Sequence, residues 1–285
     1  MALKKTQQGT DELAKVTAEL EAEEMRQPNL DAPVTDEDGV VRDVPLLAGY
    51  LDPTTGILHT TFSYREMDGA DEEAINKADV RSNPAKLANV LCERCVVAIG
   101  TLTKKEHRAE WGKIVRSMLG GDIDYMVFKI RELSKGGEIT FTHRCPNCGQ
   151  VLTTIMNTSE FTIKPFNGEW EVPFALNKGY KDLKGNIHKE GVFKLATGAD
   201  REIITPVIKK NPSTAMTMFM TRCVVFNDGT IPIQNQVKAM VLRDRKVIED
   251  IISENAFGID TSIEGLTCES CGQDISGELG QSDFF

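Results

Sequence analysis

The chain of 285 residues is predicted to adopt an α+β fold made of two pseudo-repeats. Three observations support this prediction. Segments with the apolar periodicity of helices alternate with segments typical of strand hairpins. The stretch FKLATGADREII at 193–204 repeats the pattern of YREMDGADEEAI at 64–75. Finally, RCPNCGQ at 144–150 recurs as TCESCGQ at 267–273.

The first copy begins with a strand hairpin and continues with helices. YLDPTTGILHTTFSY indicates two strands joined by a turn from Asp52 to Gly56. Asp68 and Asp71 have the spacing of a capping box at the start of a helix. Apolar periodicity predicts further helices over 84–100, over 111–118 and from Asp122 to the stop signal Gly136-Gly137.

The second copy contains the same elements in the same order. Thr197 and Asp200 again have capping-box spacing, and LRDRKVIEDIISENAFG predicts a helix with Asp244 as its N-cap. A strand-like segment precedes the second cysteine motif, as one does the first. We therefore interpret the sequence as an internal duplication, with pseudo-repeats at about 57–156 and 190–283.

The N-terminal segment 1–47 differs in composition from the rest. It contains no aromatic residue and is rich in Glu, Asp, Lys and Gln. This composition is typical of a charged, partly disordered arm, and a narrow apolar stripe would also allow the arm to fold along a partner. The remaining residues, 48–285, are predicted to form a single domain.

Four cysteines in the two repeated motifs form a candidate metal site. Each C-x-x-C pair is followed by a glycine, which can adopt the left-handed conformation that closes such a turn. Two turns of this kind at hairpin tips make a zinc ribbon, and the long separation between them is explained if the two copies pack about a pseudo-two-fold axis. We therefore predict one shared structural zinc site with these ligands: Cys145, Cys148, Cys268 and Cys271. A redox pair and an iron–sulfur cluster are the weaker alternatives.

The other cysteines are predicted to be core residues. Cys92 and Cys95 lie at i and i+3 of a predicted helix without a following glycine, and Cys223 lies in an apolar segment interpreted as a strand. The sequence also contains no phosphate-loop, dinucleotide-binding, zinc-protease or serine-hydrolase motif. We therefore expect neither an enzyme nor a small-molecule substrate.

Composition restricts the partners and the compartment. The formal net charge of −10 argues against broad binding to nucleic-acid phosphates. There is no apolar run long enough for a membrane span and no apolar core of a signal peptide near the N-terminus. These features favour a protein that is made and kept in a cytoplasm and has no membrane partner.

Six segments, in this order, resemble the T-even-type bacteriophage base-plate protein family: GADEEAI, LGGDIDYMVFKIREL, THRCPNCG, FKLATGADREI, TCESCG and the closing SDFF. The resemblance covers about 57–285. It implies a metal role for the four motif cysteines and supplies no catalytic residue. Glu269 departs from the expected pattern by taking the place of a proline in the second turn. The resemblance gives no role to the pair Cys92 and Cys95.

The resemblance implies a place in the baseplate or central hub of a contractile tail. We therefore expect a non-enzymatic structural component of the virion tail, assembled in the bacterial host cytoplasm, stabilised by zinc and acting through contacts with other tail proteins. Two alternatives stay open: a transient assembly chaperone absent from the mature particle, and a zinc-ribbon nucleic-acid-binding protein. The terminal Phe284-Phe285 pair either anchors a partner or folds back onto its own core.

Overall fold

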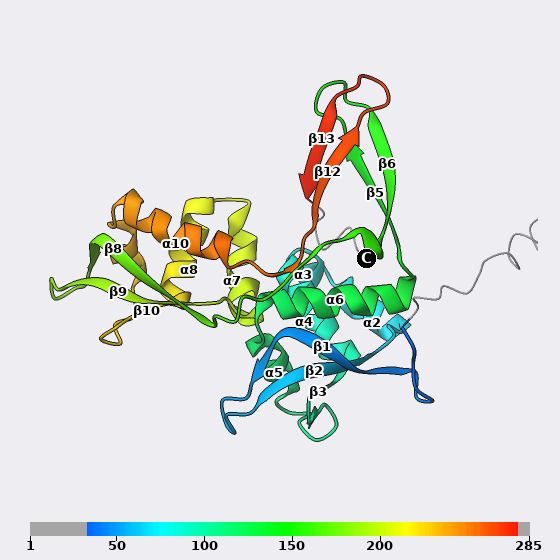
Figure 1. Cartoon of the computed structure of the whole chain (residues 1–285), viewed down its shortest axis with the longest axis horizontal. Helices are drawn as coiled ribbons and strands as arrows, with labels where there is room; N and C mark the ends of the chain where they lie inside the picture. Colours follow the sequence, from blue (N-terminus) through cyan, green and yellow to red (C-terminus); the bar gives the residue numbers. More distant parts are fainter. Residues whose placement is uncertain (1–32, 279–285) are drawn as a thin grey trace, which may run out of the picture. The chain divides into compact units, whose positions relative to one another are not determined.

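A computed structural model of the chain describes residues 33–278 (Figure 1). Most of the predicted arm and the Phe284-Phe285 pair lie outside the described residues. The first strand, β1, starts at Val40, within the segment predicted to be the arm. The described residues contain helices and several antiparallel sheets, so the predicted α+β class is confirmed.

The first repeat contains, in chain order, β1 (Val40–Leu51), β2 (Leu58–Arg65), α2 (Gly69–Ile75), α3 (Ala78–Arg81), α4 (Pro84–Cys95), β3 (Val96–Ile99), β4 (Leu102–Thr103), α5 (Trp111–Ser117), α6 (Gly120–Lys135), β5 (Glu138–Arg144) and β6 (Val151–Asn157). A short connection contains the 3-10 turn η1 (Thr158–Glu160) and β7 (Ile163–Lys164).

The second repeat contains β8 (Glu171–Lys181), β9 (Ile187–Lys194), α7 (Gly198–Ile208), α8 (Pro212–Cys223), β10 (Val224–Phe226), α9 (Gln234–Lys238), α10 (Leu242–Glu254), β11 (Gly258–Ile259), β12 (Ser262–Thr267) and β13 (Asp274–Glu278). The correspondence between the repeats starts with the hairpins β1–β2 and β8–β9, and therefore earlier in each copy than the sequence pattern indicated.

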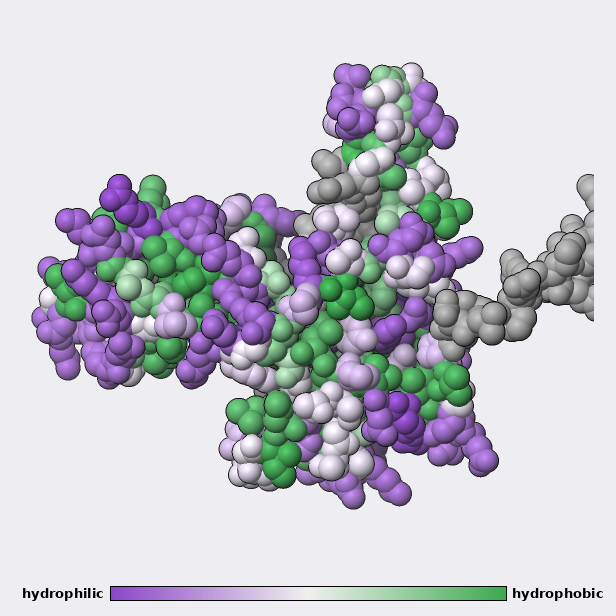
Figure 2. Space-filling model, in the orientation of Figure 1, coloured by the Kyte–Doolittle hydropathy of each residue, from purple (hydrophilic) through white to green (hydrophobic). Residues whose placement is uncertain are grey.

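The sheets of the two repeats have matching strand orders. In the first repeat the order is β1-β2-β3-β4, and in the second β8 and β9 pair with β10 in the place of β3. Both sheets are antiparallel. Each repeat also has its own large apolar cluster, one around Phe62, Leu91 and Met126, the other around Tyr180, Phe193 and Met220. Figure 2 shows mostly hydrophilic residues over the face of the second repeat that it displays, with apolar residues in smaller groups.

Both predicted capping boxes are present. Asp68 accepts a hydrogen bond from the backbone N–H of Asp71 at the start of α2, and Thr197 accepts one from Asp200 at the start of α7. In both repeats the second carboxylate also binds an arginine from the last turn of the next long helix. The distance from Arg94 Nε to Asp71 Oδ1 is 2.6 Å, and that from Arg222 Nε to the Asp200 carboxylate is 2.7 Å.

Asp71 is fully buried beneath this contact. Burial by itself would raise the pKa of its carboxyl, but hydrogen bonds from the Arg65 guanidinium, the backbone at Asp68 and the Arg94 guanidinium hold that pKa well below its usual range. The capping carboxylate therefore remains ionised and ties the start of α2 to α4.

The predicted N-cap role of Asp244 is wrong, and the helix predicted to start at Asp122 starts two residues earlier, at Gly120. The N-cap residues of α6 and α10 are Leu119 and Val241, and neither makes a side-chain capping bond. Both aspartates are third residues of their helices and fully buried, and their carboxylates bind the backbone of a distant strand instead. The prediction correctly placed an aspartate at the start of each helix. Its carboxylate, however, accepts hydrogen bonds from a strand and not from the first N–H groups of its own helix.

Each of these aspartates binds three consecutive backbone N–H groups at a β-bulge. Asp122 accepts hydrogen bonds at 2.7, 3.2 and 3.0 Å from N–H groups of β1: Leu47, Ala48 and Gly49. Asp244 accepts hydrogen bonds at 2.9, 2.9 and 2.8 Å from N–H groups of β8: Asn177, Lys178 and Gly179. Pairing is irregular at both places, so these N–H groups are free to bind the carboxylate. We call these two contacts the aspartate clamps.

Two element boundaries also differ from the sequence interpretation. The helix predicted over 84–100 ends at Cys95, and β3 follows directly. Cys223, interpreted as a strand residue, is the last residue of α8 and precedes β10 in the same way. The expected burial of Cys92, Cys95 and Cys223 is confirmed.

Candidate metal centre

The cysteine turns are formed by two hairpins with the same local structure. β5 pairs with β6 on either side of the first turn, and β12 pairs with β13 on either side of the second (Figure 1). In the first turn Gly149 N–H donates to Cys145 O at 3.0 Å, and in the second Gly272 N–H donates to Cys268 O at 2.8 Å. Both glycines have positive φ, 75° and 70°, as the left-handed turn position requires.

The two turns bring all four predicted cysteines together. Their Sγ atoms all lie within 4.8 Å of one another. The distance from Cys145 Sγ to Cys271 Sγ is 3.7 Å, and that from Cys148 Sγ to Cys268 Sγ is 3.6 Å. Four thiolates around a tetrahedral zinc ion at a bond length of about 2.3 Å would be separated by about 3.8 Å, so the arrangement fits such an ion.

A small apolar cluster supports the cysteine turns. Cys145 and Cys268, the first cysteine of each pair, are 1% exposed and pack with Ile275, while Cys148 and Cys271 are exposed. The partly buried Leu152 and Leu266 complete this cluster from the two hairpins. Its small size suggests that a bound ion would contribute much of the stability of this part of the protein.

Backbone N–H groups point toward the sulfur atoms, and their partial positive charge stabilises the thiolates. The N–H of Gln273, together with the Asn147 side-chain amide, lowers the pKa of the Cys271 thiol to about 6. The N–H of Cys148 lowers the pKa of the Cys145 thiol. The N–H of Gln150 also acts to lower the pKa of Cys148, but desolvation of its sulfur and the other three cysteines raise that pKa to about 12. Four thiolates at this spacing repel one another, and a cation would remove this repulsion.

The four described cysteines can therefore hold one metal ion. A tetrahedral ion bound by all four would have no coordination position left for a substrate. All four cysteines are free thiols, as are the three outside the site. Cys95 Sγ lies 3.6 Å from Asp71 Oδ2 and Cys92 Sγ lies 3.7 Å from Ile123 O, so these thiols belong to the first repeat's core.

The sequence interpretation missed the aspartate clamps, although a signal for them is present. LLAGY at 46–50 and LNKGY at 176–180 place a Gly-Tyr pair at matching positions of β1 and β8. An added Cβ at Gly49 would lie 2.7 Å from His59 O, and one at Gly179 would lie 2.6 Å from His188 O. This repeated glycine is the sequence mark of the bulge to which each clamp binds.

Comparison with known proteins identifies the family. The family model described as T4 bacteriophage base plate protein matches residues 59–285. No curated protein and no solved structure matched the chain. Within the described residues, no helix combines the length and apolar character needed to span a bilayer. The match covers most of the sequence and includes both cysteine motifs, both long clamp helices and both capping boxes, and the chain therefore belongs to the T4-type bacteriophage base plate protein family.

Proposed function

We propose that this protein is a non-enzymatic structural component of the baseplate or hub of a contractile phage tail, and that a structural zinc ion stabilises it. Membership of the base plate family supports the place of action. The observation that carries the proposed role is the four-cysteine site, whose sulfur spacing suits an ion fully enclosed by protein ligands.

Zinc is the ion that best suits this ligand set. Four thiolates in a tetrahedron are typical of structural zinc sites, and a zinc ion bound by four protein sulfurs has no position for a water or a substrate. The two hairpins that supply the ligands belong to different repeats. The ion would therefore join the first repeat to the second and act as a structural cross-link, in keeping with contacts to other tail proteins rather than with catalysis.

The test is the protein composition of purified phage particles. Quantitative mass spectrometry of mature virions and of isolated baseplates should find this chain at a constant ratio to the other tail proteins. If the chain is present during assembly in the host cytoplasm but absent from mature particles, the structural role is wrong and the assembly chaperone is the correct alternative. Binding to DNA at physiological salt would instead revive the nucleic-acid hypothesis.

The zinc part of the proposal has its own test in the same system. A phage that lacks the gene is complemented with the wild-type chain or with Cys268→Ser. We expect Cys268→Ser to abolish assembly of complete baseplates, because the cross-link between the repeats is lost. Cys223→Ala, which removes a buried thiol outside the site, should still support assembly. Normal baseplates with Cys268→Ser would contradict the structural role of the metal.

A further inference from the structure

The contact between the two repeats is one-sided: the start of α7 contacts the first repeat, whereas the corresponding start of α2 is exposed. The connection between α5 and α6 of the first repeat receives the start of α7 from the second. Gly120 N–H donates to Ala196 O at 3.0 Å, and Gly198 N–H donates to Met118 O at 2.9 Å. A two-fold arrangement would need the same contact between the start of α2 and the connection between α9 and α10. Gly69 and Leu242, which would form it, are exposed instead.

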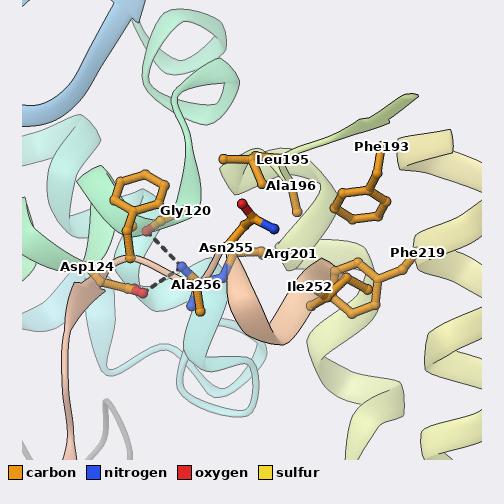
Figure 3. A pocket seen from close by; sticks show the side chains of 12 residues that line it. Gly120, Asp124, Phe193, Leu195, Ala196, Arg201, Phe219, Ile252, Asn255 and Ala256 are labelled. Carbon is orange, nitrogen blue, oxygen red and sulfur yellow. Dashed lines mark hydrogen bonds and ion pairs between the residues drawn. The ribbon is translucent and has the colours of Figure 1, made fainter. Parts of the chain in front are cut away.

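Two ion pairs flank this internal contact. Arg201 Nη1 donates to Gly120 O at 2.8 Å and to Asp124 Oδ2 at 2.7 Å (Figure 3). On the same helix, Glu202 Oε2 lies 3.2 Å from Arg116 Nε. A cavity of about 250 Å³ beside Arg201 runs between the repeats. The start of α7 is therefore held by backbone hydrogen bonds and two charge pairs.

The corresponding surfaces elsewhere in the chain are open. We call the exposed residues at the start of α2 the α2 face: Gly69, Ala70, Glu72 and Glu73. They correspond to α7 residues that are buried or half-buried. We call the counterpart of the α5–α6 connection the α9–α10 junction: Lys238, Val241, Leu242 and Lys246. Leu242 is 81% exposed and Val241 is 44% exposed, whereas Leu119, the counterpart of Val241, is 5% exposed.

The charges on these two open surfaces are complementary. Glu73 corresponds to Glu202, and Lys238 corresponds to its partner Arg116. Glu72 takes the place of Arg201, and Lys246 takes the place of Asp124, so these two positions again have opposite charges but with the signs exchanged. Lys246 is 62% exposed and contacts Asp250 on its own helix at 2.6 Å. Both ion pairs of the internal contact could thus be rebuilt between the α2 face and the α9–α10 junction.

The glycine that starts α2 adds a second observation. An added Cβ at Gly198 would lie 2.4 Å from Asn89 Oδ1 and 2.4 Å from Ile123 Cδ1, so the close internal contact requires glycine there. At Gly69 an added Cβ would meet nothing within 4 Å, and this residue does not have positive φ. Among residues 33–278 of one copy, nothing therefore gives a steric reason for glycine at the α2 face, whereas a docked neighbour would.

We propose that copies of this chain associate head-to-tail, with the α2 face of one copy docked on the α9–α10 junction of the next. We choose a second copy as the partner because the equivalent contact already forms between the two repeats of one chain. Such a contact is heterologous, so copies add in one direction and form a ring or an open filament according to the rotation between them. The proposal does not depend on the metal or on the place of action.

We expect the contact to be weaker than its internal counterpart. Asn89 Nδ2 donates to Gly198 O at 3.0 Å and to Glu202 Oε2 at 2.9 Å, but Thr217 stands at the corresponding place and donates to Ser213 O of its own helix. A neighbour would also lose translational and rotational freedom on docking, which the second repeat does not. Association should therefore be reversible and concentration-dependent.

The test is sedimentation velocity over a series of concentrations, with native mass spectrometry. The wild-type chain should increase in mean mass with concentration. Gly69→Trp, which blocks the α2 face, and Leu242→Asp, which places a charge in the α9–α10 junction, should each weaken self-association at least tenfold. Both positions are exposed, so both variants should fold with unchanged thermal stability. Leu183→Asp, at a residue that is 76% exposed in the β8–β9 turn, is the matched control and should associate like the wild type.

An equimolar mixture of the two variants tests the direction of the contact. Gly69→Trp retains an intact junction and Leu242→Asp retains an intact α2 face, so the mixture should form one-to-one heterodimers and nothing larger. A wild-type chain that stays monomeric at every concentration would overturn the proposal. So would association that neither variant weakens, or a mixture that forms no heterodimer.

Discussion

The two repeats share their internal contacts and differ at their surfaces. Each has an aspartate clamp on a bulged strand, a capping box, and an arginine that binds the capping carboxylate. In contrast, the α2 face and the corresponding part of α7 differ in exposure, and at the positions that correspond to the Arg201–Asp124 ion pair the charges are exchanged. The interactions that the repeats share are thus those within each repeat, and the differences lie where the second repeat contacts the first and at the corresponding surface of the other repeat.

The cysteine site should show the largest effect, because it belongs to both repeats at once. Cys145→Ser and Cys268→Ser should each abolish metal binding and destabilise the protein to a similar extent, since either removes one ligand of the same ion. Metal content and thermal unfolding of the two purified variants provide the measurement. If one variant kept a full complement of metal while the other lost it, two separate sites would replace the shared one.

The aspartate clamps should be the next most sensitive sites. Asp122→Ala and Asp244→Ala each leave three backbone N–H groups without their acceptor, at a cost of about 3–6 kcal/mol in the free energy of unfolding. Denaturant unfolding of both variants measures this cost. Asp124→Ala, next to the first clamp but partly exposed, is the matched control and should lose less. Loss of stability in only one of the two clamp variants would break the equivalence of the repeats.

The first clamp should also make stability depend on pH. Burial raises the pKa of Asp122 from 3.8 to about 6, against the opposing effect of the backbone hydrogen bonds from Ala48, Leu47 and Gly49. The folded-state pKa lies above the unfolded value, so the protonated carboxyl of Asp122 stabilises the folded state. This contribution to the free energy of unfolding is fully present below pH 3.8 and is lost as the pH rises through 6.

A difference of this size corresponds to at most about 3 kcal/mol. Unfolding free energies of the wild type and of Asp122→Asn, measured between pH 4 and pH 7, should therefore differ in slope, and the variant should have the flatter profile. Parallel profiles would mean that the carboxyl of Asp122 does not titrate in this range.

The smallest predicted effect concerns the two glycines that begin α2 and α7. Gly198→Ala should destabilise the protein by about 1–3 kcal/mol, since the new methyl group collides with Asn89 and Ile123. Gly69→Ala, in the same helical position but open, should be neutral or stabilise by up to about 1 kcal/mol. Thermal unfolding of this matched pair at a concentration where the chain is monomeric provides the test. Equal effects would show that the contact between the repeats is not as close as described.

The sequence was most informative where a single short stretch determines the structure. The capping boxes at Asp68 and Thr197 and the turn glycines Gly149 and Gly272 act through neighbours a few residues away, so their spacing predicts their conformation. The joining of distant cysteine pairs could be inferred only because the repetition itself suggested that equivalent hairpins meet.

Contacts between distant residues could not be predicted in the same way. Asp122 binds backbone groups more than 70 residues away, and a helix-start aspartate is equally typical of an N-cap. Apolar residues continue from α4 into β3 and from α8 into β10. No polar residue or glycine therefore marks in the sequence where the two helices end, at Cys95 and Cys223. Repetition also does not specify the rotation between the copies, and the expected pseudo-two-fold symmetry therefore does not extend to the one-sided contact.

The amount of metal bound per chain tests directly whether the four cysteines form one shared site. Elemental analysis of the purified protein, combined with native mass spectrometry of the monomeric chain, should find one zinc ion per chain, lost in both Cys145→Ser and Cys268→Ser. One ion per chain within a monomer is the result expected if a single tetrahedron of cysteines joins the two repeats. Two ions per chain, one ion shared by two chains, or a folded and equally stable protein without metal would contradict a single zinc site shared by the two repeats.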